Sequence, residues 1–165
     1  MPSYVIVGAS LTGAKSAETL RAEGFDGQVI VFGTETERPY ERPPLSKGYL
    51  LGTDRKSVIY VHDESWYAEH EVELRLGVTV TALDPAAHRL TTDDGGTLGY
   101  DRLLLATGAS PRRLSVPGSG LDGVLYLRAV ADCERLKAAF AGGGRVAVAG
   151  GGWIGLEVTA WRAAR

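Results

Sequence analysis

The hydrophobic residues of this chain fall into short runs, and several of these runs stop at a glycine. Residues 5–7, Val-Ile-Val, form one run that ends at Gly8 and is typical of a buried strand. Residues 12–23 carry apolar side chains at helical spacing and are followed by Gly24, a residue common just after a helix. Residues 28–32 form a second apolar run. We therefore expect a strand, a helix and a strand in one βαβ unit with parallel strands.

The rest of the chain alternates between further apolar runs and loop-forming segments. The prolines in residues 38–47 are expected to prevent a regular element there, and Ser46 is a candidate cap for a short helix toward Leu51. The pattern further predicts a short helix over 63–70, paired strands over 72–100 that turn at 94–96, a buried strand over 103–106, a helix over 129–140, a buried strand over 146–148 and, after the glycines at 150–152, a helix that runs to residue 165. This order of elements predicts an α/β fold.

Composition narrows the classes of function. The chain has 165 residues, of which 44% are hydrophobic and 23% charged, as is ordinary for a soluble globular protein. The formal net charge of −2 gives no reason to expect nucleic acid as a partner. We expect no membrane span, because no run reaches roughly 18 apolar residues, and no secretory signal, so a cytoplasmic location is the default expectation. One cysteine leaves no internal disulfide, and no histidine spacing suggests a metal site.

Two glycine-rich turns connect predicted strands to predicted helices. The second turn has glycine at positions 150, 152 and 155, which is the G-x-G-x-x-G pattern of dinucleotide-binding turns. In that pattern the first glycine makes the tight turn, the second lets the backbone reach a pyrophosphate, and the third lets the helix pack closely on the strand. The first turn, over 8–13, repeats the pattern with Ser10 in the middle, and Glu35 follows at a suitable distance to hold a ribose.

A plain structural turn would explain either glycine pattern, and Ser10 also invites a second interpretation. A serine on a strand-to-helix turn resembles the nucleophile elbow of hydrolases. That motif requires glycine two residues after the serine, where this chain has Thr12, and His62, His70 and His88 stand in no special context. The hydrolase interpretation is therefore the weaker one.

Taken together, these residues resemble the N-terminal part of the FAD-dependent, NAD(P)H-linked ferredoxin reductases of the pyridine nucleotide-disulfide oxidoreductase superfamily. That group includes the putidaredoxin, rhodocoxin and biphenyl-dioxygenase reductase components. The resemblance covers essentially the whole chain and rests on residues 5–13, RPYERPPLSK over 38–47, YDRLLLATG over 100–108, YLR over 126–128 and GGGWIGLE over 150–157.

The resemblance implies a fold and an activity. The fold would be a Rossmann-like FAD-binding domain with an inserted β-hairpin region over residues 1–115. A linker and the truncated start of a second Rossmann-like, NAD(P)-binding domain would follow over 116–165. The activity would be oxidoreduction, in which electrons pass from NAD(P)H through FAD to a ferredoxin-type [2Fe-2S] protein.

The resemblance also implies roles for individual residues. Lys47 would sit close to the isoalloxazine ring and pair with Glu157. The residues implied to contact FAD are Gly8, Ser10, Thr12 and Gly13 at the pyrophosphate, Glu35 at the ribose, Arg42 and Lys47 on the flavin side, Val80 at the adenine, and Ala106, Thr107, Gly108 and Arg128. Those implied to hold NAD(P)H are Gly150, Gly152, Ile154 and Gly155.

The residues by themselves leave plainer roles open. Lys47 fits a solvated loop lysine, and Glu157 lies in the first turn of a helix, where the helix dipole favours any carboxylate. Arg42 and Arg128 fit surface arginines, and Thr107 fits a turn cap. Cys133 is expected in the core.

The second dinucleotide-binding unit is incomplete in this sequence. An acidic residue is expected about 20 residues after Gly155, near position 175. We therefore expect the chain by itself to bind FAD weakly or not at all, and not to turn over NADH. Two hypotheses stay open, a portion of a reductase and a non-catalytic nucleotide-binding or interaction remnant of one.

Overall fold

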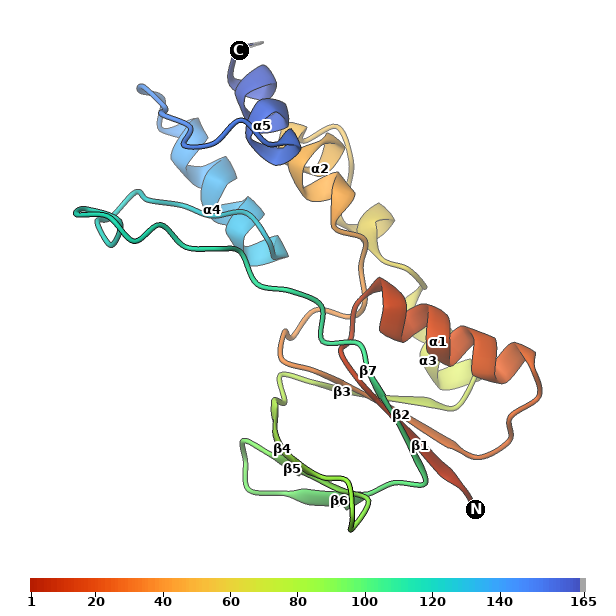
Figure 1. Ribbon diagram of the computed structural model, residues 1–165. Helices are drawn as coiled ribbons and strands as arrows, with labels where there is room; N and C mark the ends of the chain where they lie inside the picture. Colours follow the sequence, from red (N-terminus) through yellow and green to blue (C-terminus); the bar gives the residue numbers. More distant parts are fainter. Residues whose placement is uncertain (164–165) are drawn as a thin grey trace. The chain divides into compact units, whose positions relative to one another are not determined.

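The short apolar runs form one parallel sheet in the computed structural model, which describes the backbone of residues 1–163 and the side chains of residues 1–160 (Figure 1). Its strands, in spatial order, are β3 (Val72–Leu76), β2 (Gln28–Gly33), β1 (Ser3–Val7) and β7 (Arg102–Leu105). Val5 lies opposite Ile30 on one side and Leu103 on the other. The parallel βαβ unit is thus confirmed.

The chain divides into two compact units that are not contiguous in sequence. One unit contains Met1–Glu41 and Tyr60–Gly108, and the other contains Arg42–Ile59 and the chain from Ala109 onward. The parallel sheet belongs to the first unit. The boundary predicted near residue 115 stays a prediction.

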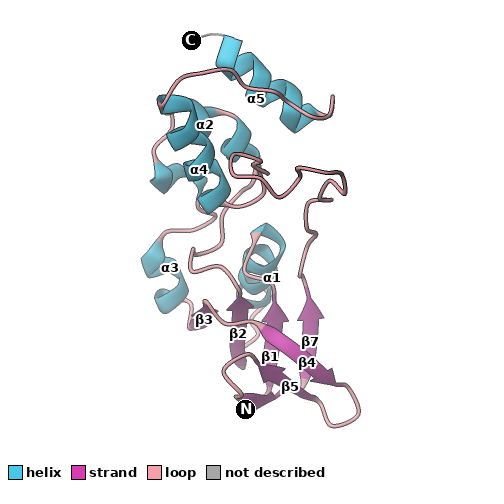
Figure 2. Cartoon of the chain, turned by 90° about the vertical axis from the view of Figure 1, so that its left-hand side faces the viewer, coloured by secondary structure: helices cyan, strands magenta, loops and turns pink. Residues whose placement is uncertain are grey.

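Alternate residues of β1 and β2 build a core on each face of the sheet. On one face, α1 (Leu11–Ala22) and α3 (Glu64–Glu69) cover a cluster that includes Ile6, Val29 and Val31. On the other face, Val5, Val7, Ile30 and Phe32 pack against Leu90. Leu90 lies in an antiparallel sheet of β4 (Val80–Asp84), β5 (Arg89–Thr92) and β6 (Thr97–Gly99). In Figure 2, β4 and β5 cross the lower part of the parallel strands.

The predicted strand pairing over 72–100 is correct only in part. The turn at residues 94–96 joins β5 to β6, as expected. Residues 72–76, by contrast, leave the antiparallel region and pair with β2 in parallel as β3. Val72 supplies the reason, because its side chain is 5% exposed and belongs to the core that α1 and α3 cover.

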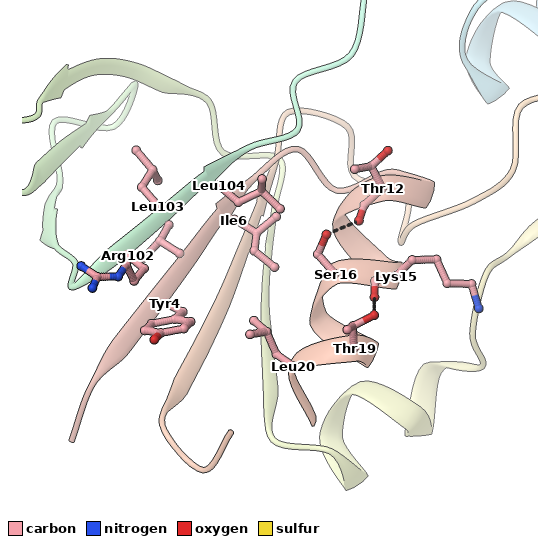
Figure 3. Close-up of a pocket in the computed structure, with 11 residues that line it drawn as sticks. Tyr4, Ile6, Thr12, Lys15, Ser16, Thr19, Leu20, Arg102, Leu103 and Leu104 are labelled. Carbon is pink, nitrogen blue, oxygen red and sulfur yellow. Dashed lines mark hydrogen bonds between the residues drawn. The ribbon is translucent and has the colours of Figure 1, made fainter. Parts of the chain in front are cut away.

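Strand β7 is present as predicted, but its expected burial is wrong. Leu104 and Leu105 are 39% and 56% exposed. Among the described residues β7 has a neighbouring strand only on the β1 side, so it lies at an edge of the sheet. A groove of about 460 Å³ lies beside it, lined on one side by Ile6 and Leu104 and on the other by polar α1 residues such as Thr12 and Ser16 (Figure 3).

The second unit is built from helices and irregular segments. Up to residue 163 it contains two 3-10 turns and three α-helices: η1 (Pro43–Ser46), α2 (Gly48–Leu51), η2 (Lys56–Ile59), α4 (Val130–Ala141) and α5 (Trp153–Ala163). The prolines did not prevent a regular element, because Pro43 begins η1 at a position that needs no backbone N–H donor. No helix in the described part of the chain is long and apolar enough to cross a membrane.

The strand predicted over residues 146–148 is absent from the structure, where this segment is irregular. Val146 and Val148 are 44% and 42% exposed. A parallel strand needs a neighbouring strand for its backbone hydrogen bonds, and no strand of the second unit is found within the described residues. The helix that follows is present over Trp153–Ala163, and the last two residues predicted for it lie outside the described residues.

We predict that Gly13→Ala destabilises the first unit although Gly13 lies within a helix. Alanine normally favours a helix over glycine by about 1 kcal/mol. A Cβ at this position would lie 2.0 Å from the carbonyl oxygen of Gly8, and such overpacking costs about 1–3 kcal/mol or more. Urea unfolding should therefore show a lower free energy of unfolding for Gly13→Ala than for the natural sequence. Gly99→Ala is the matched control, because its nearest non-neighbouring atom is 3.8 Å away. Equal midpoints for the two variants would contradict the argument.

We predict a pH-dependent loss of stability for Asp132→Ala. Burial raises the pKa of this carboxyl, but the amides of Ala129 and Arg128 and the side chain of Arg135 outweigh burial and bring the pKa below its ordinary value. The carboxylate accepts from these amides at 2.9 and 3.0 Å and so caps the start of α4. Losing such a cap costs about 1 kcal/mol at neutral pH. Because the pKa of Asp132 is lower in the folded state, the stabilisation by its carboxylate is lost as the pH falls through that lowered pKa. Urea titrations from pH 7 to pH 2 test this, with Asp122→Ala, at an exposed aspartate outside any helix, as the control substitution.

Candidate functional site

Backbone hydrogen bonds from two neighbouring strands close the first glycine turn. The Gly8 amide donates to the Phe32 carbonyl at 2.8 Å, and the Ala106 amide donates to the Val7 carbonyl at 2.7 Å. Gly8 has a φ of +126°, which side chains rarely tolerate, and a Cβ there would lie 2.1 Å from the Ala106 oxygen. The turn therefore requires glycine at position 8 for both conformation and space.

The N-terminus of α1 follows this turn directly. Its first helical hydrogen bond runs from the Ala14 amide to the Ser10 carbonyl at 2.9 Å. The backbone of Ser10 is extended, and its hydroxyl makes no capping hydrogen bond to the helix. The amides of residues 11–13 therefore have no partner within the helix, and the helix dipole adds positive potential at this end. Such an end is suited to a phosphate group.

The second glycine turn, in the other unit, repeats the positive φ of the first glycine and the start of the helix, but no strand immediately precedes it among the described residues. Gly150 has a φ of +114°, and the Leu156 amide donates to the Gly152 carbonyl at 3.1 Å. A Cβ on Gly155 would lie 2.7 Å from the Gly150 oxygen, which parallels the contact between Gly13 and Gly8. Position 152 thus corresponds to position 10. A glycine in this turn stands where the first turn has serine, and Ile154 is exposed in the first turn of α5.

The other candidate residues of the first unit lie at the ends of strands. Glu35 follows β2 and accepts a hydrogen bond of 2.6 Å from the hydroxyl of the buried Tyr40. Val80 begins β4 next to a shift in register. It packs against the core that contains Phe32 and Leu90. Thr107 and Gly108 follow β7 and are exposed. The structure thus gives Glu35 a fixed environment, whereas Thr107 stays open to solvent.

In the second unit, an ion pair joins the proline-rich segment to α5. Lys47 Nζ lies 2.9 Å from Glu157 Oε1. The hydrogen bond from Lys47 is the main cause that holds the pKa of Glu157 below its usual range, and a hydrogen bond from Ser46 adds to it. The lysine side chain is 55% exposed and the glutamate side chain 27%. The structure brings together the pair that the resemblance implied, while its catalytic role stays a prediction.

Arg42 and Arg128 also meet within the second unit. The Arg42 guanidinium donates to the Arg128 carbonyl, and both side chains are half-buried. The Arg128 Nε is buried and has no hydrogen-bond partner among the described residues. The two arginines are therefore packed into the unit and are not simple surface residues.

Ser46 is a residue of this region whose contact the sequence does not reveal. It was a candidate cap for α2, but Lys47 occupies the N-cap position of that helix. The Ser46 hydroxyl instead donates to Glu157 Oε2 at 2.5 Å. No signal in the sequence indicates a contact between residues so far apart in the chain.

The environments of the histidines and the cysteine bear on the alternative chemistries. His62 and His70 stack on Trp66, and His88 stacks on Tyr100, so each imidazole is engaged with an aromatic ring. Cys133 is buried, its thiol donates to the Leu45 carbonyl, and burial raises its pKa to about 11. This is a core cysteine with little thiolate character. Within the described residues, no cluster of three metal-ligating side chains occurs.

Comparisons with known proteins agree on one family. The family described as pyridine nucleotide-disulphide oxidoreductase matches residues 2–165. The ferredoxin–NAD(+) reductase component of the anthranilate 1,2-dioxygenase system of Burkholderia cepacia is 45% identical over 95% of this chain and 39% of its own length. Rhodocoxin reductase of Rhodococcus erythropolis is 39% identical over 96% of this chain and 37% of its own length. The solved structure of the ferredoxin reductase for the CYP199A2 system from Rhodopseudomonas palustris has a TM-score of 0.94 at 33% identity, with 99% of this chain and 40% of that chain covered. The chain thus spans about two fifths of the length of these proteins.

We predict that the Lys47–Glu157 pair contributes little to stability. Exposed ion pairs contribute about 0.2–1 kcal/mol, so Lys47→Met should lower the free energy of unfolding by less than about 1 kcal/mol. Lys15→Met is a matched control, because Lys15 is 52% exposed and forms a 2.7 Å pair with Glu18. Urea unfolding should give similar small changes for both variants. A loss of several kcal/mol for Lys47→Met alone would mean that the pair serves stability.

Proposed function

The chain belongs to the pyridine nucleotide-disulphide oxidoreductase family, and from that premise we propose that it contributes both nucleotide-binding turns of an NAD(P)H-dependent ferredoxin reductase. Membership of this family implies FAD and NAD(H) as cofactors. The proposed protein passes electrons from NAD(P)H through FAD to a small iron–sulfur protein, and we propose a [2Fe-2S] ferredoxin as the acceptor. The observation that carries this proposal is the matched geometry of the two turns, each ending in a helix N-terminus.

The first turn fits the pyrophosphate of FAD. Helix α1 is long enough to have a substantial dipole, and Ser10 leaves its first amides uncapped. The N–H groups of residues 11–13 would hold the phosphate oxygens, and the Glu35 carboxylate, which Tyr40 orients, would accept hydrogen bonds from the ribose hydroxyls. We further propose that the Val80 backbone contacts the adenine and that Ala106, Thr107 and Gly108 adjoin the same cofactor.

The second turn fits the pyrophosphate of NAD(P)H. A Cβ at position 150, 151 or 152 would meet no other group within 4 Å, so space for a ligand is open beside this backbone. We propose that Gly150, Gly152, Ile154 and Gly155 line that site. Helix α5, which begins at Trp153, supplies the uncapped amides.

Lys47 and Glu157 are the proposed charge pair of the reaction. Bound flavin supplies the hydride and single-electron chemistry, so the protein needs no side-chain nucleophile. The Lys47 ammonium would favour negative charge on its ligand, and Glu157 would limit that field by partial neutralisation. Arg42 and Arg128 are proposed to contact the cofactor on the same side.

The cysteine content supports a metalloprotein acceptor over a disulfide substrate. A disulfide reductase mechanism needs a reactive cysteine pair. This chain holds one cysteine, which is buried in the second unit with a raised pKa. The portion of the protein described here therefore offers no thiol relay, which agrees with direct transfer from flavin to an iron–sulfur centre.

One observation favours the alternative of a non-catalytic remnant. Ser10 places a Cβ and a hydroxyl where the second turn has Gly152. If the added atoms block the approach of a pyrophosphate, the turn keeps its structure and loses its ligand.

Titration of the purified chain with FAD separates the two functions. We expect weak binding, with a bound-flavin absorption spectrum at saturation. Ser10→Gly should tighten this binding by about tenfold, which corresponds to about 1.4 kcal/mol, because it removes the Cβ and hydroxyl from the path of the pyrophosphate. Glu35→Ala should weaken it. Ser119→Gly, which alters a loop serine of the other unit, is the control.

A folded chain in which neither the natural sequence nor Ser10→Gly binds FAD would overturn the proposal that the first turn of this chain holds FAD, and it would favour the non-catalytic alternative.

A further inference from the structure

The carboxylate of Glu157 is held through both of its oxygens by two consecutive residues. Lys47 Nζ lies 2.9 Å from Oε1, and the Ser46 hydroxyl donates to Oε2 at 2.5 Å. Both contacts are charge-assisted, and the short distance of the second is typical of an O–H donor to a carboxylate. Glu157 therefore has two donors of different character on its two oxygens.

The two donors differ most in their freedom to move. Ser46 is 7% exposed, whereas the Lys47 side chain is 55% exposed. A lysine has four rotatable bonds and loses much conformational entropy when it is held in one geometry, whereas a serine hydroxyl has one. Lys47 alone would therefore hold the Glu157 carboxylate in one orientation only weakly, whereas Ser46 can hold it firmly.

The segment that carries Ser46 is itself held in place within the second unit. Leu45 is 2% exposed, and its carbonyl accepts a hydrogen bond of 3.2 Å from the Cys133 thiol of α4. The hydroxyl of the buried Tyr49 bonds to the Glu134 carboxylate, and Lys137 lies 4.1 Å from the centre of the Tyr49 ring. The hydroxyl of Ser46 is therefore presented from a fixed backbone.

We propose that Ser46 is a positioning residue, whose hydroxyl fixes the carboxylate of Glu157 so that its other oxygen faces Lys47. Ser46 thereby sets how much of the Lys47 charge is neutralised. The importance of this for the cofactor rests on the function proposed above, but the positioning itself does not. The lowered pKa of Glu157 supports the arrangement, because Ser46 is one of its causes after Lys47.

The consequence of losing the hydroxyl follows from these contacts. Without it, the carboxylate keeps a single donor, which is flexible and largely exposed. The pair then spends more time open, so Glu157 takes up a proton more readily and the ammonium of Lys47 is less neutralised.

The direct test is a pH titration of Glu157 by carbon NMR in the flavin-free chain labelled at glutamate carboxyls, with Glu157→Gln to assign the signal. Ser46→Ala should raise the pKa of Glu157 toward its ordinary value. Ser46→Thr, which keeps the hydroxyl, should leave it low. Ser57→Ala, at an exposed serine in η2, is the control. An unchanged pKa in Ser46→Ala would overturn the proposal, as would an equal rise in Ser46→Thr.

A change in folding is separated from a change in positioning by circular dichroism of each variant. If Ser46→Ala does not fold, Ser46→Cys replaces it, because its thiol has nearly the same shape and is a weak donor. The pKa of Glu157 should then rise by an intermediate amount, and no rise would overturn the proposal.

A second readout connects the serine to the cofactor. In the FAD-loaded chain, Ser46→Ala should raise the midpoint potential, because a less neutralised cation favours the reduced, anionic flavin. A raised pKa with an unchanged potential would overturn the influence on the cofactor. If the chain binds no FAD, the proposed function fails, and the titration of Glu157 still decides whether Ser46 positions the carboxylate.

Discussion

Two backbone carbonyl oxygens, that of Gly8 just after β1 and that of Ala106 just after β7, leave no room for side chains in the turn between β1 and α1. The Gly8 carbonyl faces position 13, and the Ala106 carbonyl faces position 8. Both oxygens belong to residues whose amides are hydrogen-bonded to a neighbouring strand, so they cannot move aside without disturbing these bonds. Helix α1 can therefore leave the sheet at this short distance only with glycine at both positions. The direction of its N-terminal amides is a result of that crowding.

The charges of the candidate site follow a different rule. Lys47 is largely exposed, so its attraction to Glu157 is screened by water and contributes little to folding. What the fold does provide is the frame around the pair, through the buried Leu45 and Ser46. Buried, well-packed residues thus fix the orientation of an ion pair that is itself weak. That distribution is expected where a charge serves a ligand and not the fold.

Local patterns predicted the elements that depend on local chemistry. The parallel unit of β1, α1 and β2 and the two glycine turns follow from apolar periodicity and from the conformations that only glycine adopts. The sequence could not predict the features that depend on distant partners. Residues 72–76 read equally well as a strand of either sheet, and residues 146–148 are apolar but lack a neighbouring strand among the described residues. The exposure of Leu105 and the contact of Ser46 with Glu157 likewise depend on which elements meet in space.

The chain leaves the first unit after Glu41 and returns to it at Tyr60. The two ends of this excursion are joined, because Tyr40 and Tyr60 form an antiparallel bridge and the Val61 amide donates to the Pro39 carbonyl at 3.0 Å. These contacts offset the entropic cost of closing the loop over residues 42–59. That cost depends only weakly on loop length, so a longer or shorter segment would change it little. The first unit has a hydrophobic core on each face of its sheet, and the second unit buries apolar residues of its own, such as Leu45, Tyr49 and Phe140. Amide hydrogen exchange is therefore expected to be slowest in the central strands β1 and β2, where paired backbone groups are covered by buried side chains.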